Sequence, residues 1–175
     1  MKYNYFFLII LILLPEIAFS QEGKKINIDG QNIFFRVAGN GNKTPILIIH
    51  GLGMSSKFWE NNMPSLSQDR KVFAIDLPGF GFSDTPRDAA LIKNYITLLK
   101  KFLSQQKISK VILLGHSTGG SICILYTIRN PNEVEKLILT DSDGGPIIKE
   151  DYPFNLLKPI VIGEMIFLTR DKKMI

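Results

Sequence analysis

The sequence predicts an α/β fold, with a mostly parallel sheet flanked by helices. Continuous apolar runs bounded by turn residues recur along the chain, as in 45–50 and 110–115, and such runs are typical of strands buried on both faces of a parallel sheet. Segments with apolar residues at three- and four-residue spacing lie between these runs. This alternation of strands and helices predicts crossover connections, and therefore a parallel sheet.

Length and composition are those of one globular domain. The chain has 175 residues, of which 45% are apolar and 21% charged, enough for a hydrophobic core. The net charge is +5, but the basic residues are scattered singly or in pairs, so nucleic-acid binding is not expected. The single cysteine, Cys123, has apolar neighbours and is predicted to be a small buried residue, not a reactive thiol.

The first twenty residues differ from the rest. Lys2 precedes an apolar run at 6–14, and the segment ends in Ala18-Phe19-Ser20, which together predict a secretory signal peptide over residues 1–20. The run is too short to span a bilayer comfortably. We therefore expect a secreted or periplasmic protein, with an uncleaved membrane anchor as the alternative. Transient membrane contact through this segment stays open.

Six segments are expected to be strands, the first two joined by a turn at Asp29-Gly30. The expected strands are 24–30, 31–39, 45–50, 71–76, 110–115 and 136–141. The expected helices are 57–67, 88–106 and 117–129. The polar loop at 39–44 lacks the glycine that a phosphate-binding loop needs before its lysine, and a strand follows it, so phosphate binding is excluded.

The strand–helix pattern breaks after Asp141. Residues 21–150 are expected to form the N-terminal part of a core domain. Residues 151–175 are apolar, are interrupted by Pro153 and Pro159, and are expected to be helical in part. With no strand recognised beyond it, the strand at 136–141 is expected to be an unpaired apolar edge.

The first chemical motif is Gly115-His116-Ser117-Thr118-Gly119, a G-x-S-x-G sequence between an expected strand and an expected helix. A serine on such a sharp turn is raised clear of the sheet, and side chains at the glycine positions would collide with neighbouring elements. Ser117 is therefore the candidate nucleophile. The backbone N–H of Thr118, at the start of the helix, can point at a developing oxyanion.

The second motif is His50-Gly51-Leu52-Gly53, which follows the strand at 45–50. A glycine-rich turn at this place leaves backbone N–H groups available. The N–H of Leu52 is expected to complete an oxyanion hole with that of Thr118, while His50 braces the loop.

The third motif is the segment 76–83, DLPGFGFS. Asp76 ends a strand at the same edge of the sheet, where functional groups of open parallel sheets gather. We expect its carboxylate to fix the loop that forms the floor of the site, and a catalytic role for it is the less favoured reading.

In this order the motifs resemble the α/β-hydrolase fold superfamily. The matching sequences are HGLG at 50–53, FW at 58–59, DLPGFGFSD at 76–84 and GHSTGG at 115–120. The resemblance implies that Ser117 forms an acyl-enzyme, that Leu52 and Thr118 supply the oxyanion N–H groups, and that no cofactor is needed. Serine rather than aspartate at this turn argues against dehalogenase-like and epoxide-hydrolase-like members. It favours acyl transfer to water from a small-molecule ester, lactone, thioester or amide.

The general base is missing from the sequence. The family places its histidine after the nucleophile. In this sequence the only histidines are His50 and His116, and both precede Ser117. His50 lies on the oxyanion side, poorly placed to take the hydroxyl proton, and the side chain of His116 is expected to diverge from that of Ser117. Asp141 is the candidate acid, ahead of Asp143, but has no histidine to orient.

The sequence is therefore expected to be the N-terminal part of a serine hydrolase, incomplete at its C-terminus, with 151–175 as the start of a cap region. Such a chain should have little activity. Two alternatives remain: a non-catalytic binding protein that keeps the pocket, and one half of a split hydrolase whose complementing C-terminal half is a second chain. No metal site is expected, because two widely spaced histidines without cysteine partners do not form one.

Overall fold

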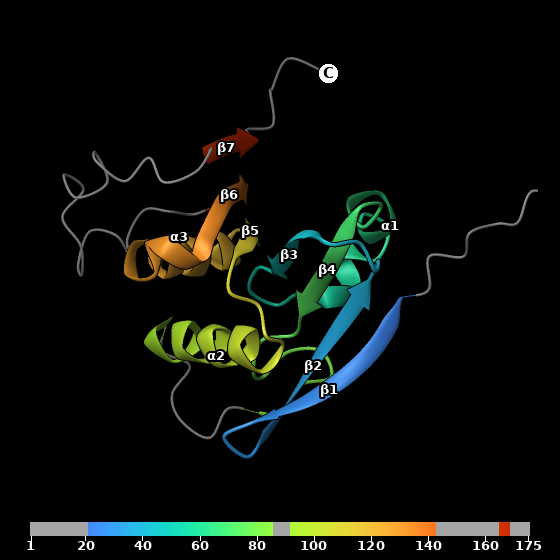
Figure 1. The fold of residues 1–175 in the computed structure, drawn as a ribbon. Coiled ribbons are helices and arrows are strands. Elements are labelled where there is room, and N and C mark those ends of the chain that lie inside the picture. The colour runs from blue at the N-terminus through green and yellow to red at the C-terminus, as the bar shows by residue number, and fades with distance from the viewer. Residues whose placement is uncertain (1–20, 86–91, 143–164, 169–175) are drawn as a thin grey trace, which may run out of the picture.

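The computed structural model describes residues 21–85, 92–142 and 165–168 (Figure 1). The expected signal peptide at 1–20 and the candidate Asp143 lie outside the described residues. The elements are β1 (Glu22–Ile28), β2 (Gln31–Ala38), β3 (Lys43–Ile49), η1 (Ser56–Trp59), α1 (Met63–Leu66), β4 (Arg70–Ile75), α2 (Ile92–Gln105), β5 (Val111–His116), α3 (Thr118–Arg129), η2 (Pro131–Glu133), β6 (Val134–Thr140) and β7 (Met165–Leu168).

The described strands form one sheet in the order β1-β2-β4-β3-β5-β6-β7. β1 and β2 are antiparallel to each other, and β2 is antiparallel to β4. The pairs from β4 through β7 are parallel. The predicted class, a mostly parallel sheet flanked by helices, is confirmed. Because β3, β4, β5 and β6 run in the same direction, their carboxyl ends meet at one edge, which we call the carboxyl edge.

The hairpin between β1 and β2 turns where the sequence predicts. Asp29 and Gly30 have φ values of 52° and 80°, the left-handed conformations that a two-residue hairpin turn requires. The side chain of Asn27 accepts a hydrogen bond from the N–H of Gly30 at 3.0 Å. This turn fixes the register of the two strands.

Two hydrophobic clusters cover the faces of the sheet. The larger one lies on the face of α2 and α3, which contact each other (Figure 1), and includes Phe102, Leu113 and Tyr126. The smaller one lies on the opposite face with η1 and α1, and includes Trp59 and Leu114. Side chains of β5 alternate between the clusters, as the two-residue period of a strand demands. Cys123 belongs to the larger cluster and is fully buried, as predicted.

The segment predicted as one helix at 57–67 instead forms the short 3₁₀ helix η1 and the one-turn helix α1. Pro64 lies in the first turn of α1, where its missing N–H costs nothing, but it cannot continue a helix that begins several residues earlier. The apolar spacing seen in the sequence is real, since Trp59 and Met63 are both buried.

The prediction that 136–141 is an unpaired edge is wrong. β6 pairs in parallel with β7, from Leu137 opposite Met165 to Thr140 opposite Leu168. The apolar run of β7 lies in a segment where we expected partial helix, and four apolar residues fit a buried strand as well as a helix turn. Among the described residues no helix is long and apolar enough to cross a membrane.

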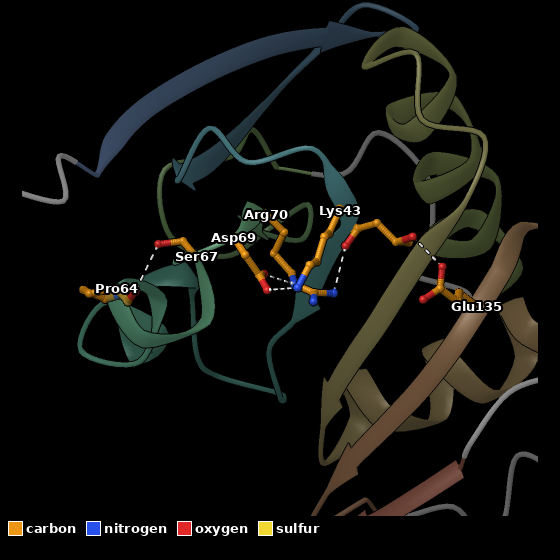
Figure 2. Close-up of polar contacts among 7 residues, drawn as sticks. Lys43, Pro64, Ser67, Asp69, Arg70 and Glu135 are labelled. Atoms are coloured by element: carbon orange, nitrogen blue, oxygen red, sulfur yellow. Dashed lines mark hydrogen bonds and ion pairs between the residues drawn. The ribbon is translucent and has the colours of Figure 1, made fainter.

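The amino ends of the parallel strands are joined by a polar network, shown in Figure 2. Asp69 accepts hydrogen bonds from Lys43 at 2.7 Å and from Nε of Arg70 at 2.8 Å. Arg70 also donates to the carbonyl of Thr44 at 3.2 Å, and the Thr44 hydroxyl donates to Glu135 on β6. We call this end of the sheet the amino edge.

Candidate active site

Ser117 lies at the carboxyl edge, between β5 and α3. Its φ of 51° and ψ of −126° are strained for a residue with a side chain, and such strain is concentrated at functional sites. The N–H of Ser117 donates to the carbonyl of Thr140 at 3.2 Å, and its carbonyl accepts from Gly120 at 2.8 Å. The turn is thus held from the neighbouring strand β6 and from the first turn of α3.

The two glycines of the motif leave room for this turn. A Cβ on Gly119 would lie 2.5 Å from the carbonyl oxygen of His50, and one on Gly115 would lie 2.6 Å from the carbonyl oxygen of Gly119. Both distances are to backbone atoms, which cannot rotate away. Only glycine therefore lets α3 approach β3 and β5 this closely.

The loop after β3 begins directly beside the serine. A Cβ on Gly51 would lie 3.1 Å from Cβ of Ser117. The carbonyl of Gly51 accepts the N–H of Met54 at 3.2 Å, which closes a turn, and the side chain of Leu52 on this turn is 74% exposed. The structure thus brings the 50–53 loop, Ser117 and the start of α3, at Thr118, to one place, which we call the candidate active site.

His50 is buried beneath this loop, with an exposed fraction of 1%. Its Nε2 accepts the N–H of Leu77 at 3.0 Å, and its Nδ1 lies 2.8 Å from the carbonyl oxygen of Gly51. An N–H can only donate and a carbonyl can only accept, so the ring is neutral with its hydrogen on Nδ1. Burial lowers the pKa of His50, against smaller opposing effects of the Gly51 hydrogen bond and the charge of Asp76.

Asp76 is fully buried, and its carboxylate is a structural acceptor. Oδ1 accepts the N–H of Ser56 at 2.6 Å, at the start of η1, and Oδ2 accepts the N–H of Phe82 at 2.9 Å. The carbonyl of Asp76 also accepts the hydroxyl of Ser83 at 2.6 Å. One side chain therefore ties η1 to the loop after β4.

His116 and Phe58 form an aromatic contact next to the nucleophile. Their ring centroids are 5.4 Å apart with an interplanar angle of 37°. The His116 ring also adjoins the loop, since a Cβ on Gly51 would lie 2.9 Å from its Nδ1. The sequence motif FW marked the segment of Phe58 but gave it no role in the site. The exposure of a large apolar side chain here, 52%, is visible only in the structure.

The end of β6 contributes three polar residues. Asp141, the candidate acid, is exposed and has a φ of 44°. The hydroxyl oxygens of Thr140 and Ser142 are buried and have no hydrogen-bond partner among the described residues. Sequence reasoning missed these two hydroxyls, because a threonine at a strand end is usually solvated. No group of three or more metal-binding side chains is found in the part of the chain that the structure describes.

Comparison with known proteins gives the same fold. A family model described as alpha/beta hydrolase fold matches residues 44–165. The chain is 38% identical over 108 residues to 1-acylglycerol-3-phosphate O-acyltransferase ABHD5 of Rattus norvegicus, covering 59% of this chain and 31% of that protein. The chain thus spans about a third of the length of this curated relative.

Solved structures show the same fold. A membrane phospholipase A, a bacterial virulence factor, superposes with a TM-score of 0.67 at 29% identity, covering 70% of this chain and 40% of that one. The epoxide hydrolase CorEH superposes with a TM-score of 0.69 at 28% identity, covering 79% and 49%. Because the family model spans more than half of the chain and includes the 50–53 loop and Ser117, the chain belongs to the α/β-hydrolase fold family.

Proposed function

We propose that this chain carries the nucleophile and the oxyanion loop of a serine hydrolase acting on carboxylic esters or related acyl substrates. The observation that carries this proposal is the strained backbone of Ser117, with φ at 51°, at the end of β5. Strain of this kind lifts a hydroxyl out of the sheet, and the glycine-rich 50–53 loop adjoins this serine at Gly51. Membership of the α/β-hydrolase fold family supports the proposal.

In the proposed reaction, Oγ of Ser117 attacks the acyl carbonyl carbon as its proton passes to a base. The N–H groups of Leu52 and Thr118 stabilise the oxyanion that forms. The leaving group departs as an alcohol, and water then hydrolyses the acyl-serine to a carboxylic acid. We assign His50, Gly51, Asp76, Gly115, His116 and Gly119 to the support of this site.

The base is not His50, because the hydrogen bonds to Leu77 and Gly51 occupy both of its ring nitrogens. We propose that the base belongs to polypeptide beyond these 175 residues, and that the chain alone is weakly active. Loss of the histidine in a serine triad costs orders of magnitude in rate but leaves the oxyanion hole working. Asp141 remains a candidate acid that would orient such a histidine. The complementing part could equally be a second chain, as in a split hydrolase.

Chemical rescue tests this proposal. The purified chain is incubated with an activated p-nitrophenyl ester, with and without free imidazole as a substitute base, and acylation is read by mass spectrometry of the peptide that contains Ser117. We expect acylation that increases with imidazole and is lost in Ser117→Ala. This variant also corrects for the hydrolysis that imidazole causes by itself. No acyl-serine under either condition would contradict the proposal and favour the non-catalytic binding protein.

A second candidate is acyl transfer to an alcohol. It is favoured by the relative named 1-acylglycerol-3-phosphate O-acyltransferase ABHD5, at 38% identity. The acyl-serine would be the same, and the acceptor hydroxyl of 1-acylglycerol-3-phosphate would replace water. Adding this acceptor to the rescue experiment separates the two: a diacylated product indicates transfer, and free carboxylic acid alone indicates hydrolysis.

A further inference from the structure

We infer that His116 is a positioning residue that holds the 50–53 loop against Ser117 through the shape of its ring, an inference that rests on the proposed function. The sequence places His116 beside the nucleophile but offers it no catalytic use. In the structure its ring contacts Phe58 and also lies against Gly51. The ring therefore links η1 to the loop that would supply the oxyanion N–H of Leu52.

The Gly51 side of this contact is tight. A Cβ at Gly51 would lie 2.9 Å from Nδ1 and 3.4 Å from Cε1 of His116, and 3.1 Å from Cβ of Ser117. The backbone of Gly51 thus packs in the angle between the histidine ring and the serine. If the ring were removed, this backbone would lose one of the two walls that fix its distance from the nucleophile.

Phe58 connects the His116 ring to the core. Phe58 contacts Trp59 edge to face, with centroids 5.5 Å apart, and Trp59 is anchored in the smaller core cluster. The start of η1 is also held by the hydrogen bond from Ser56 to Asp76. His116 therefore contacts a segment that is attached to the core through Trp59 and Asp76, and its ring links Gly51 to that segment.

The ring acts by contact. Its Nδ1 is buried, and no hydrogen bond links it to any residue in the described ranges. His116 projects from β5 toward the same face as Leu114, two residues earlier, which belongs to the smaller cluster. An aromatic ring without nitrogen should therefore perform the same task, and a small side chain should not.

Formation of a boronate adduct tests this inference without a base. Phenylboronic acid forms an O–B bond to Oγ of Ser117 while the hydroxyl proton passes to buffer, and boron becomes a tetrahedral anion whose oxygen occupies the oxyanion position. The dissociation constant is measured by ¹¹B NMR titration. We expect His116→Ala to weaken the adduct about tenfold, because small displacements of a preorganised site are costly. We expect His116→Phe to stay within about twofold of the parent chain, because the ring volume is kept.

Three further measurements make the outcome decisive. Ile108→Ala removes a partly buried side chain in the loop before β5, away from the site, and should leave the affinity unchanged, which controls for general destabilisation. Ser117→Ala should form no adduct. Amide hydrogen exchange at Met54, whose N–H bonds to Gly51, should accelerate in His116→Ala and not in His116→Phe.

The outcomes separate the inference from the proposed function. Equal adduct affinity in the parent chain and in His116→Ala overturns the positioning role and leaves the serine chemistry intact. If the parent chain forms no adduct, the proposed function fails, and the exchange rate at Met54 decides the inference. An unchanged rate in His116→Ala then overturns it, and a faster rate that His116→Phe restores supports it.

Discussion

At the amino edge of the sheet, Asp69 accepts hydrogen bonds from both Lys43 and Arg70 (Figure 2), whereas at the carboxyl edge Thr140 and Ser142 bury hydroxyl oxygens that no described residue satisfies. The same strands produce both edges. Buried polar groups without partners are rare and costly in folded proteins, and three of the five such atoms among the described residues, on His116, Thr140 and Ser142, lie at the carboxyl edge. This concentration indicates which end of the sheet is organised for something other than stability.

Exposed apolar side chains follow the same division, and so does the strained nucleophile, although Lys107, ahead of β5, also has a positive φ of 57°. Ser117 and Asp141, with φ values of 51° and 44°, both follow strands at the carboxyl edge. The exposed large apolar side chains among the described residues lie at this edge as well: Leu52 and Phe82 on loops and Phe58 on η1. The amino edge has a network of paired charges in their place. The paired charges of the amino edge stabilise the fold, whereas the strained backbone at the carboxyl edge presents a reactive group.

The carboxyl edge itself has two layers. Beneath the strained residues, His50 and Asp76 are buried with their hydrogen-bonding atoms satisfied. This lower layer supports the upper one, since it fixes the loops that follow β3 and β4. We therefore expect substitutions in the supporting layer to lower the free energy of unfolding most. Substitutions of the exposed charges at the amino edge should lower it least.

Removing the Asp76 carboxylate should have the largest effect. In Asp76→Ala, the buried N–H of Ser56 and the partly buried N–H of Phe82 lose their acceptor. We expect the free energy of unfolding to fall by about 3 kcal/mol, since charged acceptors to buried donors are worth more than neutral ones. Urea denaturation followed by circular dichroism measures this loss. A variant as stable as the parent chain would show that the lower layer does not stabilise the fold.

Protonation of His50 should have the next largest effect. Burial lowers the pKa of His50 in the folded chain, so below the unfolded value of about 6.5 the unfolded state binds more protons. Stability is therefore fully present above that pH and is lost as the pH falls below it. The loss from this group is at most about 1.4 kcal/mol per pH unit.

The chain provides a matched control for this measurement. His50→Gln keeps an acceptor within reach of Leu77 but removes the titrating ring, while His116, the other histidine of the sequence, is present in both proteins. Unfolding free energies are compared between pH 7.5 and pH 5. The parent chain should lose more stability than the variant over this range. Equal losses would mean that His50 is not held neutral by the fold.

The sequence predicts the fold and the position of the motifs well, because both depend on local patterns. Apolar runs and their spacing identify β3 to β6, and the G-x-S-x-G motif places Ser117 at a strand end, where the structure has it. The two errors concern short elements. One-turn helices such as α1, and a four-residue strand such as β7, carry too few residues for a periodic signal.

Contacts between distant segments could not be predicted. The sequence indicates that Asp76 fixes the loop after β4, but its partner on η1 is twenty residues away, and nothing in that segment marks the N–H of Ser56 as a donor to a carboxylate. The ring of His116 against Gly51 is a similar case, since 65 positions separate them in the sequence. Such contacts depend on the register of neighbouring strands, which the pattern of any one strand does not contain.

Neutralising Asp69 should have the smallest effect. Hydrogen bonds from Arg70 and Lys43 lower its pKa to about 2, so its contribution is present above the unfolded value of about 3.9 and is lost as the pH falls toward 2. Asp69 is nevertheless close to solvent, and exposed ion pairs contribute little. Asp69→Asn should therefore change the unfolding free energy at pH 7 far less than Asp76→Ala, and should differ from the parent chain less at pH 2 than at pH 7. If instead the two substitutions are equally destabilising, the amino edge is as essential to the fold as the supporting layer, and the contrast between the two ends of the sheet does not separate stability from function.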